Sequence, residues 1–239
     1  MRTILVTAFL LVGSAWGRSV LAQDASARAS YRALTQTPPG ALPTPVGLSV
    51  TGSDRRGWTV HARYGLTSFN DEDYVHNVGI GVDVGVGSGR LGLTLGGYEP
   101  ACGGGDCPGH FMTAVGYSER VVGAALGRTA SSATLNLGLD LTAAFANPPG
   151  ASLYAGSVGL PVTLVSSAPG FRVIPYLEPG LGTGWVRDHG ETDAGIRATF
   201  GAGVAAIGLA PGFGFSAGVK RVFLRDGNWV VGVGLSYGR

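Results

Sequence analysis

The chain has 239 residues, of which 45% are hydrophobic, 13% are charged and 42 are glycine, with a formal net charge of +2. Globular proteins carry about 25% charged residues and about 7% glycine, so this chain has too few charges to cover a water-facing surface of ordinary composition. The nearly balanced charge excludes a strongly basic surface for nucleic acid. After the first dozen residues there is no run of about 18 apolar residues, which excludes transmembrane helices but not transmembrane strands.

The N-terminal segment 1–22 has the three parts of a secretory signal peptide. Arg2 supplies a basic start, residues 4–12 are apolar, and Val20-Leu21-Ala22 forms a small-x-small cleavage site, with a second site after Gly17 left open. Loss of this segment leaves as many basic as acidic residues. An exported chain is therefore expected.

The next segment, 23–45, is polar, rich in Ala, Ser, Thr and Pro, and shows no period. Such a composition buries too little apolar surface to fold, so we predict a disordered periplasmic lead. Residues 46–51 form a short apolar run that is either a strand piece or a segment tucked into the following domain. We assign 46–239 to that domain.

From Trp58 onward, apolar residues alternate with small or polar ones. In the clearest segment, 134–142, every second residue is leucine, and Asn136, Gly138 and Asp140 stand between them. Strand side chains alternate with a period of two, so each segment predicts a strand with one apolar face. The expected strands lie within 58–66, 77–86, 91–95, 110–128, 134–142, 154–164, 172–185, 196–204, 213–220 and 229–237.

The connections between these strands alternate between tight turns, such as Gly87-Ser88-Gly89, and longer loops, such as the polar segment 187–195. This pattern predicts an all-β fold, an antiparallel up-and-down transmembrane β-barrel of about ten strands. The phase slips near Ser118-Glu119-Arg120, which indicates a bulge or an extra turn. Splitting 110–128 and counting 46–51 gives twelve strands, and merging weak hairpins gives eight.

Two orientations of the faces fit the alternation. A secreted soluble barrel would hold its apolar faces inside, whereas a membrane barrel turns them toward lipid. Glycine on the other faces favours the membrane barrel, because small residues leave room in a narrow lumen for a few long, paired side chains. The charged or titratable residues of these faces are His61, Arg63, Asp83, Arg90, Asp140, Arg172, Glu178, Arg197 and Lys220.

Aromatic residues near the strand ends support the same orientation, because membrane barrels carry aromatic girdles at both interfaces. All of them fall on the apolar faces: Trp58, Tyr64, Tyr154, Phe171, Trp185, Phe213, Trp229 and Tyr237. We therefore expect the apolar faces to contact outer-membrane lipid.

Cys102 and Cys107 are the two cysteines of the chain and are separated by Gly-Gly-Gly-Asp. In an oxidising compartment they are expected to form a disulfide, which stabilises so small a loop by roughly 2 kcal/mol. A zinc site is the alternative, but two thiols with His110 as the nearest histidine make a poor four-ligand set. We assign no metal and no cofactor.

For catalysis, His189 is the best candidate, because Asp188, Glu191 and Asp193 are close to it in sequence. A histidine beside carboxylates can act as a general base, yet no nucleophile is spaced to suggest a triad, so no catalytic residue is assigned. The Asp71-Glu72-Asp73 run is expected to be a solvated loop.

The segment from Trp58 to Arg239 resembles the small bacterial outer-membrane β-barrels, the OmpA/OmpX-like and opacity-protein-like proteins. The resemblance rests on the signal peptide and the final alternating strand, whose terminal aromatic residue is read in that family by the barrel-assembly machinery. Tyr237 holds this position here, although Gly238 and Arg239 follow it.

The resemblance implies an integral barrel of the bacterial outer membrane, with membrane lipid and the assembly machinery as partners, and it assigns no loop partner. A non-enzymatic structural or surface-interacting barrel with a side-chain-filled lumen is expected. A narrow diffusion pore and an outer-leaflet lipid-modifying enzyme are the alternatives.

Overall fold

The computed structural model describes residues 57–68, 74–99, 109–126, 133–147, 151–166, 171–188, 191–208, 210–223 and 228–238. Within these ranges, no helix is long and apolar enough to cross a membrane. Several predictions lie outside the described residues: the signal peptide, the lead 23–45, the run 46–51, the acidic run 71–73, the Cys102–Cys107 disulfide and His189.

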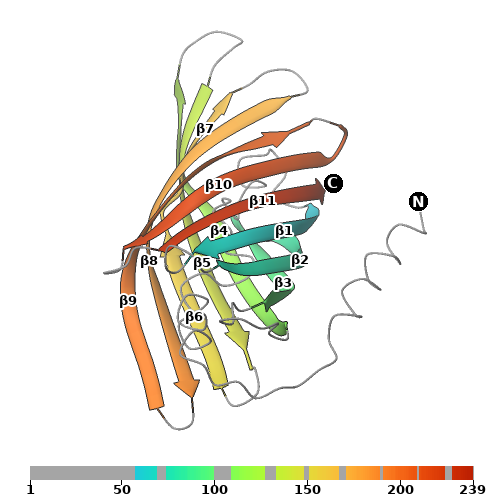
Figure 1. Cartoon of the computed structure of the whole chain (residues 1–239). Coiled ribbons are helices and arrows are strands. Elements are labelled where there is room, and N and C mark those ends of the chain that lie inside the picture. Colours follow the sequence, from blue (N-terminus) through green and yellow to red (C-terminus); the bar gives the residue numbers. More distant parts are fainter. Residues whose placement is uncertain are drawn as a thin grey trace, which may run out of the picture.

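The described residues form eleven strands of one sheet (Figure 1). They are β1 (Trp58–Ser68), β2 (Tyr74–Val86), β3 (Gly89–Glu99), β4 (His110–Leu126), β5 (Ala133–Ala146), β6 (Ala151–Gly159), β7 (Val162–Ser166), β8 (Arg172–Asp188), β9 (Glu191–Ile207), β10 (Phe213–Phe223) and β11 (Asn228–Gly238).

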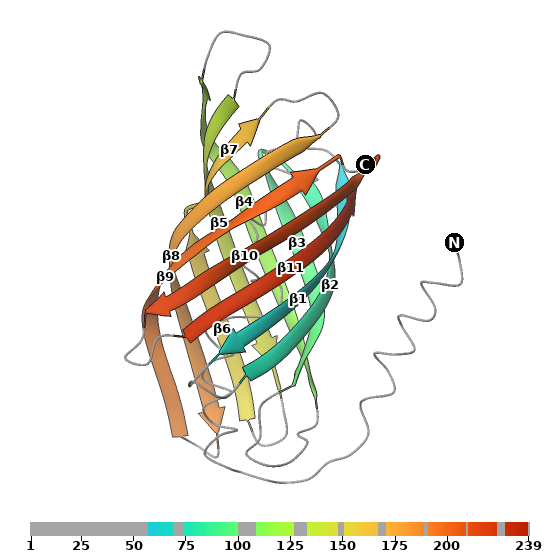
Figure 2. The same ribbon diagram turned by 45° about the horizontal axis from the view of Figure 1, so that its top comes forward.

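The sheet closes on itself, because β1 pairs with both β2 and β11, and every pairing is antiparallel. Strands β6 and β7 share one position in the wall, since both pair with β5 and with β8. Pro161 lies between them and has no N–H to donate, but its carbonyl accepts a hydrogen bond from the Gly138 N–H at 2.8 Å. The barrel therefore has ten strand positions, which confirms the predicted architecture (Figures 1 and 2).

We call the barrel end where β1 begins and β11 ends the terminal rim, and the opposite end the loop rim. The tight turn at Gly87-Ser88 and the β9–β10 turn lie at the terminal rim, as an up-and-down topology requires. Gly87 and Gly212 both have positive φ, a left-handed backbone that favours glycine in these turns.

The phase slip predicted near Ser118-Glu119-Arg120 is a β-bulge. Pairing with β5 runs to Arg120↔Gly138 and resumes at Val122↔Leu137, so Val121 is the extra residue. β4 continues through the bulge as a single strand, and the twelve-strand alternative is therefore wrong.

The polar segment 187–195, predicted as a loop, is mostly strand. β8 extends to Asp188 and β9 begins at Glu191, with the pairs Arg187↔Thr192 and Asp188↔Glu191 in register. The polarity of the side chains favoured a loop, but a two-strand ladder is held by backbone hydrogen bonds whatever the side chains are.

Most aliphatic residues point away from the lumen; the buried exceptions are Val75, Leu153, Val165, Ile174, Val222 and Val230. Ile80, Leu93 and Val233 are 49%, 50% and 42% exposed, whereas lumen-facing residues of the same strands such as Asn77 and Thr94 are buried. The soluble alternative with an apolar interior is therefore wrong, and the apolar faces form the outer surface.

Aromatic side chains lie on this outer surface at both rims. At the terminal rim, the Tyr237 ring lies 4.9 Å from Phe213 and 6.0 Å from Trp58 between centroids. Toward the loop rim, Phe145 and Tyr154 are 5.1 Å apart, and the Arg221 guanidinium lies 5.0 Å from the Trp229 ring centroid. The barrel thus carries an apolar belt between two aromatic girdles, the surface pattern of membrane barrels.

Candidate functional site

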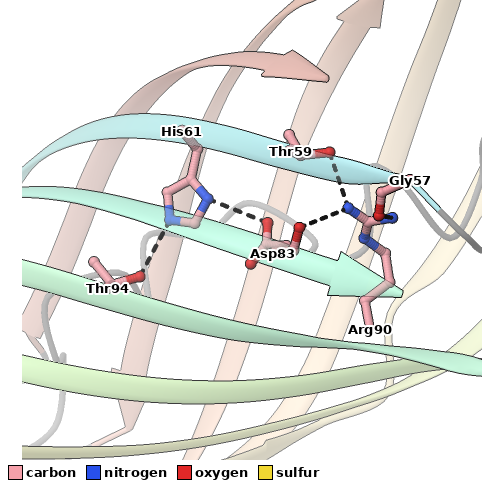
Figure 3. Close-up of polar contacts among 6 residues, drawn as sticks. All are labelled: Gly57, Thr59, His61, Asp83, Arg90 and Thr94. Carbon is pink, nitrogen blue, oxygen red and sulfur yellow. Dashed lines mark hydrogen bonds and ion pairs between the residues drawn. The ribbon is translucent and has the colours of Figure 1, made fainter. Parts of the chain in front are cut away.

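The lumen holds a chain of three hydrogen-bonded side chains from β1, β2 and β3. His61 Nδ1 lies 3.1 Å from Asp83 Oδ2, and His61 Nε2 lies 3.1 Å from Thr94 Oγ1 (Figure 3). With the imidazole proton on Nδ1, the ring donates to the carboxylate and accepts from the threonine hydroxyl. All three residues are buried, so the chain ties three neighbouring strands together from inside.

Arg90 lies beside this chain at the terminal rim. Its guanidinium donates to the Gly57 carbonyl at 3.1 Å, to Thr59 Oγ1 at 3.0 Å and to the Asp83 carbonyl at 3.1 Å (Figure 3). The side chain is 2% exposed. The buried Arg90 side chain of β3 therefore hydrogen-bonds to Gly57, to β1 through Thr59 and to β2 through Asp83.

A second buried group lies on the opposite wall. Lys220 Nζ of β10 donates to Glu178 Oε1 of β8 at 2.9 Å, and each side chain is 7% exposed. β9 lies between these strands, and both residues are in register with its Gly201. A Cβ atom at Gly201 would meet its nearest neighbour, the Glu178 Cβ, at an ordinary 3.5 Å.

The same complementarity recurs around the lumen: most charged or large polar side chains are in register with a glycine. A Cβ atom at Gly81 would lie 2.5 Å from His61 Nε2, and one at Gly92 would overlap the Asp83 carboxylate. Interleaved glycines thus provide the volume for the polar groups. The pairs are His61↔Gly81, Arg63↔Gly79, Asp83↔Gly92, Arg90↔Gly85, Asp140↔Gly159, Tyr176↔Gly203, Glu178↔Gly201 and Arg197↔Gly182.

The remaining residues predicted for the lumen are placed there in different degrees. Asp140 is buried, and Arg63 is half-buried within electrostatic range of Asp83 and Asp140. Arg172 and Arg197 are half-buried, and Arg197 donates to the Ile196 carbonyl at 3.1 Å.

The sequence placed Asn136 and Tyr176 on glycine-rich faces but did not single them or Thr163 out as site residues, because isolated Thr, Asn and Tyr residues on an alternating face carry no signal of their own. Asn136, Thr163 and Tyr176 are consecutive neighbours across β5, β7 and β8. Each is buried, and among the described residues their oxygens Oδ1, Oγ1 and OH have no hydrogen-bond partner.

The order carboxylate, imidazole, hydroxyl is the order that activates a nucleophile in hydrolases. Here the Thr94 hydroxyl is buried in the lumen wall, where it lies 3.1 Å from His61 Nε2. The described residues contain no cluster of three or more His, Cys, Asp or Glu side chains arranged to hold a metal. The hydrogen bonds of His61 connect β1 with β2 and β3.

Comparison with known proteins gives structural matches and no sequence matches. A scan of family models and a search of the curated proteins both find nothing. The outer-membrane enzyme PagL is 11% identical, with 75% of this chain and 98% of PagL covered and a TM-score of 0.39.

The β domain of the Bordetella autotransporter BrkA is 16% identical, with 77% and 99% covered and a TM-score of 0.43. Ail of Yersinia pestis is 12% identical, with 76% and 97% covered and a TM-score of 0.31. All three TM-scores are below 0.5, so these matches assign neither a family nor a function to the chain.

Proposed function

We propose that this protein is a non-enzymatic, integral β-barrel of the bacterial outer membrane, with a lumen closed by side chains and a structural or surface-interacting role. One observation carries the proposal: the charged pairs inside the barrel are buried. Asp83, Arg90, Glu178 and Lys220 are 2–6% exposed, whereas side chains lining a water-filled channel stay accessible to water.

The outer surface supports the membrane part of the proposal. Soluble monomers rarely expose a contiguous apolar patch larger than a few hundred Å². Here outward valines, leucines, isoleucines and phenylalanines occur on every strand position of the closed wall. Contact with acyl chains removes this surface from water, and export through the predicted signal peptide would deliver the chain to the assembly machinery.

A closed lumen leaves the loop rim as the place for contact with other molecules. The connections there join β1 to β2, β3 to β4, β5 to β6, β8 to β9 and β10 to β11. With both termini in the periplasm, these connections lie outside the cell. We assign the surface-interacting role to them, without a named partner.

Conductance in planar bilayers tests the closed lumen. The wild-type barrel is expected to give no stable single-channel steps. A triple variant, Arg90→Ala with Glu178→Ala and Lys220→Ala, removes the buried side chains from both walls and is expected to conduct. Stable steps from the wild-type protein would overturn the closed-lumen proposal.

A narrow diffusion pore is the second candidate, and the unpartnered oxygens of Asn136, Thr163 and Tyr176 favour it. Buried polar atoms are usually satisfied by protein or by ordered water, so this row is a place for water inside the barrel. If this row of oxygens is part of a continuous water path, the wild-type protein conducts and Thr163→Val lowers its conductance. The closed-lumen proposal expects no wild-type conductance at all.

The non-enzymatic part rests on the burial of the Asp83–His61–Thr94 chain. Thr94→Ala and His189→Ala separate the two possible catalytic centres, one in the lumen and one in the predicted outer loop. We expect the wild-type protein to hydrolyse neither phospholipid nor lipid A. An activity abolished by either substitution would overturn this part of the proposal.

A further inference from the structure

Strand β4 continues past the end of its neighbour β3. The last pair between them is Gly89↔Glu119, and β3 cannot extend farther because the Gly87-Ser88 turn precedes it. β4 nevertheless runs on to Leu126, paired with β5 up to Leu126↔Ala133. Figure 2 shows β4 and β5 rising beyond the adjoining strands. Within the described residues, Arg120 and residues 122–126 therefore pair with β5 only, and Val121 is the extra residue of the bulge. We call residues 121–126 the open edge.

The open edge is apolar and exposed on both of its faces. Val121 and Val122 are each 58% exposed and Leu126 is 49% exposed, and Gly123, Ala124 and Ala125 between them are exposed as well. Edge strands are normally protected by charges, by proline or by a covering segment. Residues 121–126 contain neither charge nor proline, and the nearest charge is Arg120, directly before them. Its backbone groups, which face no other described strand on the β3 side, and its aliphatic side chains make a template for one more strand.

The N-terminal part of the chain begins within reach of this template. Gly57 lies at the terminal rim, where its carbonyl accepts a hydrogen bond from the Gly85 N–H at 3.2 Å, close to the turn that ends β3. Three strand spacings, about 14 Å, separate β1 from β4. The six residue steps from Thr51 to Gly57 can span about 20 Å, so a segment ending at Thr51 reaches the open edge.

The segment 46–51 also has the required pattern and length. Val46, Leu48 and Val50 alternate with Gly47, Ser49 and Thr51, and its six residues equal the six of the open edge. At the terminal rim, β4 leads out of the barrel, whereas β1 leads from this rim toward the loop rim. Residues 46–51, which precede β1, would therefore run toward the barrel and antiparallel to β4. We propose that residues 46–51 of the same chain pair with the open edge as an added antiparallel strand.

Disulfide trapping tests the proposal in the full exported chain, with Cys102→Ser and Cys107→Ser to remove the native thiols. Leu48→Cys is combined with Val122→Cys, Ala124→Cys or Leu126→Cys. We expect an intramolecular cross-link with at least one of the three. The matched control combines Leu48→Cys with Ala143→Cys, an outward alanine in the other half of β5, which is expected not to cross-link. No cross-link at any open-edge position, or a cross-link between two chains, would overturn the proposal.

Amide hydrogen exchange gives an independent readout. Ser49→Pro removes a backbone donor from the proposed strand, and Ser49→Ala keeps it. Ser49→Pro is expected to speed exchange of those amides of 121–126 that point away from β5 by at least about tenfold, and to leave exchange in β10 unchanged. Ser49→Ala is expected to change neither. Equal exchange in the wild type and both variants would contradict the added strand.

Discussion

Glu178 and Lys220 meet across a glycine: their charged atoms are 2.9 Å apart, although a whole strand separates β8 from β10. Both are in register with Gly201 of the intervening strand β9. The pair illustrates why this barrel combines so much glycine with so few charges. Each buried charge needs a partner of opposite charge. Each long side chain is accommodated beside a position that has no side chain.

Removing one member of this pair should destabilise the barrel more than removing both. Lys220→Met leaves the Glu178 carboxylate buried and uncompensated, which costs about 3 to 5 kcal/mol. Glu178→Leu combined with Lys220→Met replaces the pair with apolar side chains and should recover most of that loss. Urea unfolding in lipid vesicles measures both variants. A double variant as unstable as the single one would contradict the pairing.

The glycine complementarity predicts unequal responses to alanine. Gly81→Ala pushes against His61 and Thr94 and should lower the free energy of unfolding by about 1 to 3 kcal/mol. Gly156→Ala is the matched control, because a Cβ there meets its nearest neighbours at an ordinary 3.6 Å. Comparable losses at the two positions, measured by the same unfolding experiment, would remove the steric explanation.

Thr94→Val tests the hydrogen bond at the end of the Asp83–His61–Thr94 chain. The substitution keeps the shape but leaves His61 Nε2 buried without its partner, which costs about 1 to 3 kcal/mol. Thr113→Val, on the outer face of β4, removes no described lumen contact and should change stability little. The melting temperature in detergent compares the two, and equal shifts would show that the lumen contact contributes nothing.

The two-residue period predicted the wall of this barrel well, because adjacent residues such as Leu93 and Thr94 must point to opposite faces of a strand. It also located the bulge, since an extra residue at Val121 shifts the phase of everything after it. The polar segment before Gly195 was misjudged, because polarity reports solvent exposure and not backbone pairing.

The lumen contacts were beyond prediction from the sequence. His61 is 22 residues from Asp83 and 33 from Thr94, and only the register of three strands brings them together. A one-residue slip would turn one strand's polar face outward, so the pairs depend on register that composition does not specify. The lumen face of each charge could be predicted, but its partner could not.

An outward charge should prevent folding into lipid. Leu93→Arg places a guanidinium on the belt at a cost of about 2 to 4 kcal/mol near the bilayer midplane. Leu93→Ala removes the same side chain without adding a charge and should fold at nearly the wild-type yield. Heat-modifiable gel mobility after refolding into vesicles gives both yields, and an Arg variant that folds as well as the Ala variant would contradict the outer-face assignment.

Depth-resolved quenching tests the central claim most directly. With Cys102→Ser and Cys107→Ser to remove the native thiols, a fluorophore is attached to single cysteines at the outward positions Ile80, Leu93 and Val233, and at the lumen positions Asn77, Thr94 and Ser216. The vesicles contain lipids spin-labelled along the acyl chain. The account predicts strong quenching at the three outward positions and little at the three lumen positions. Equal quenching in both sets, or stronger quenching from the lumen set, would contradict it.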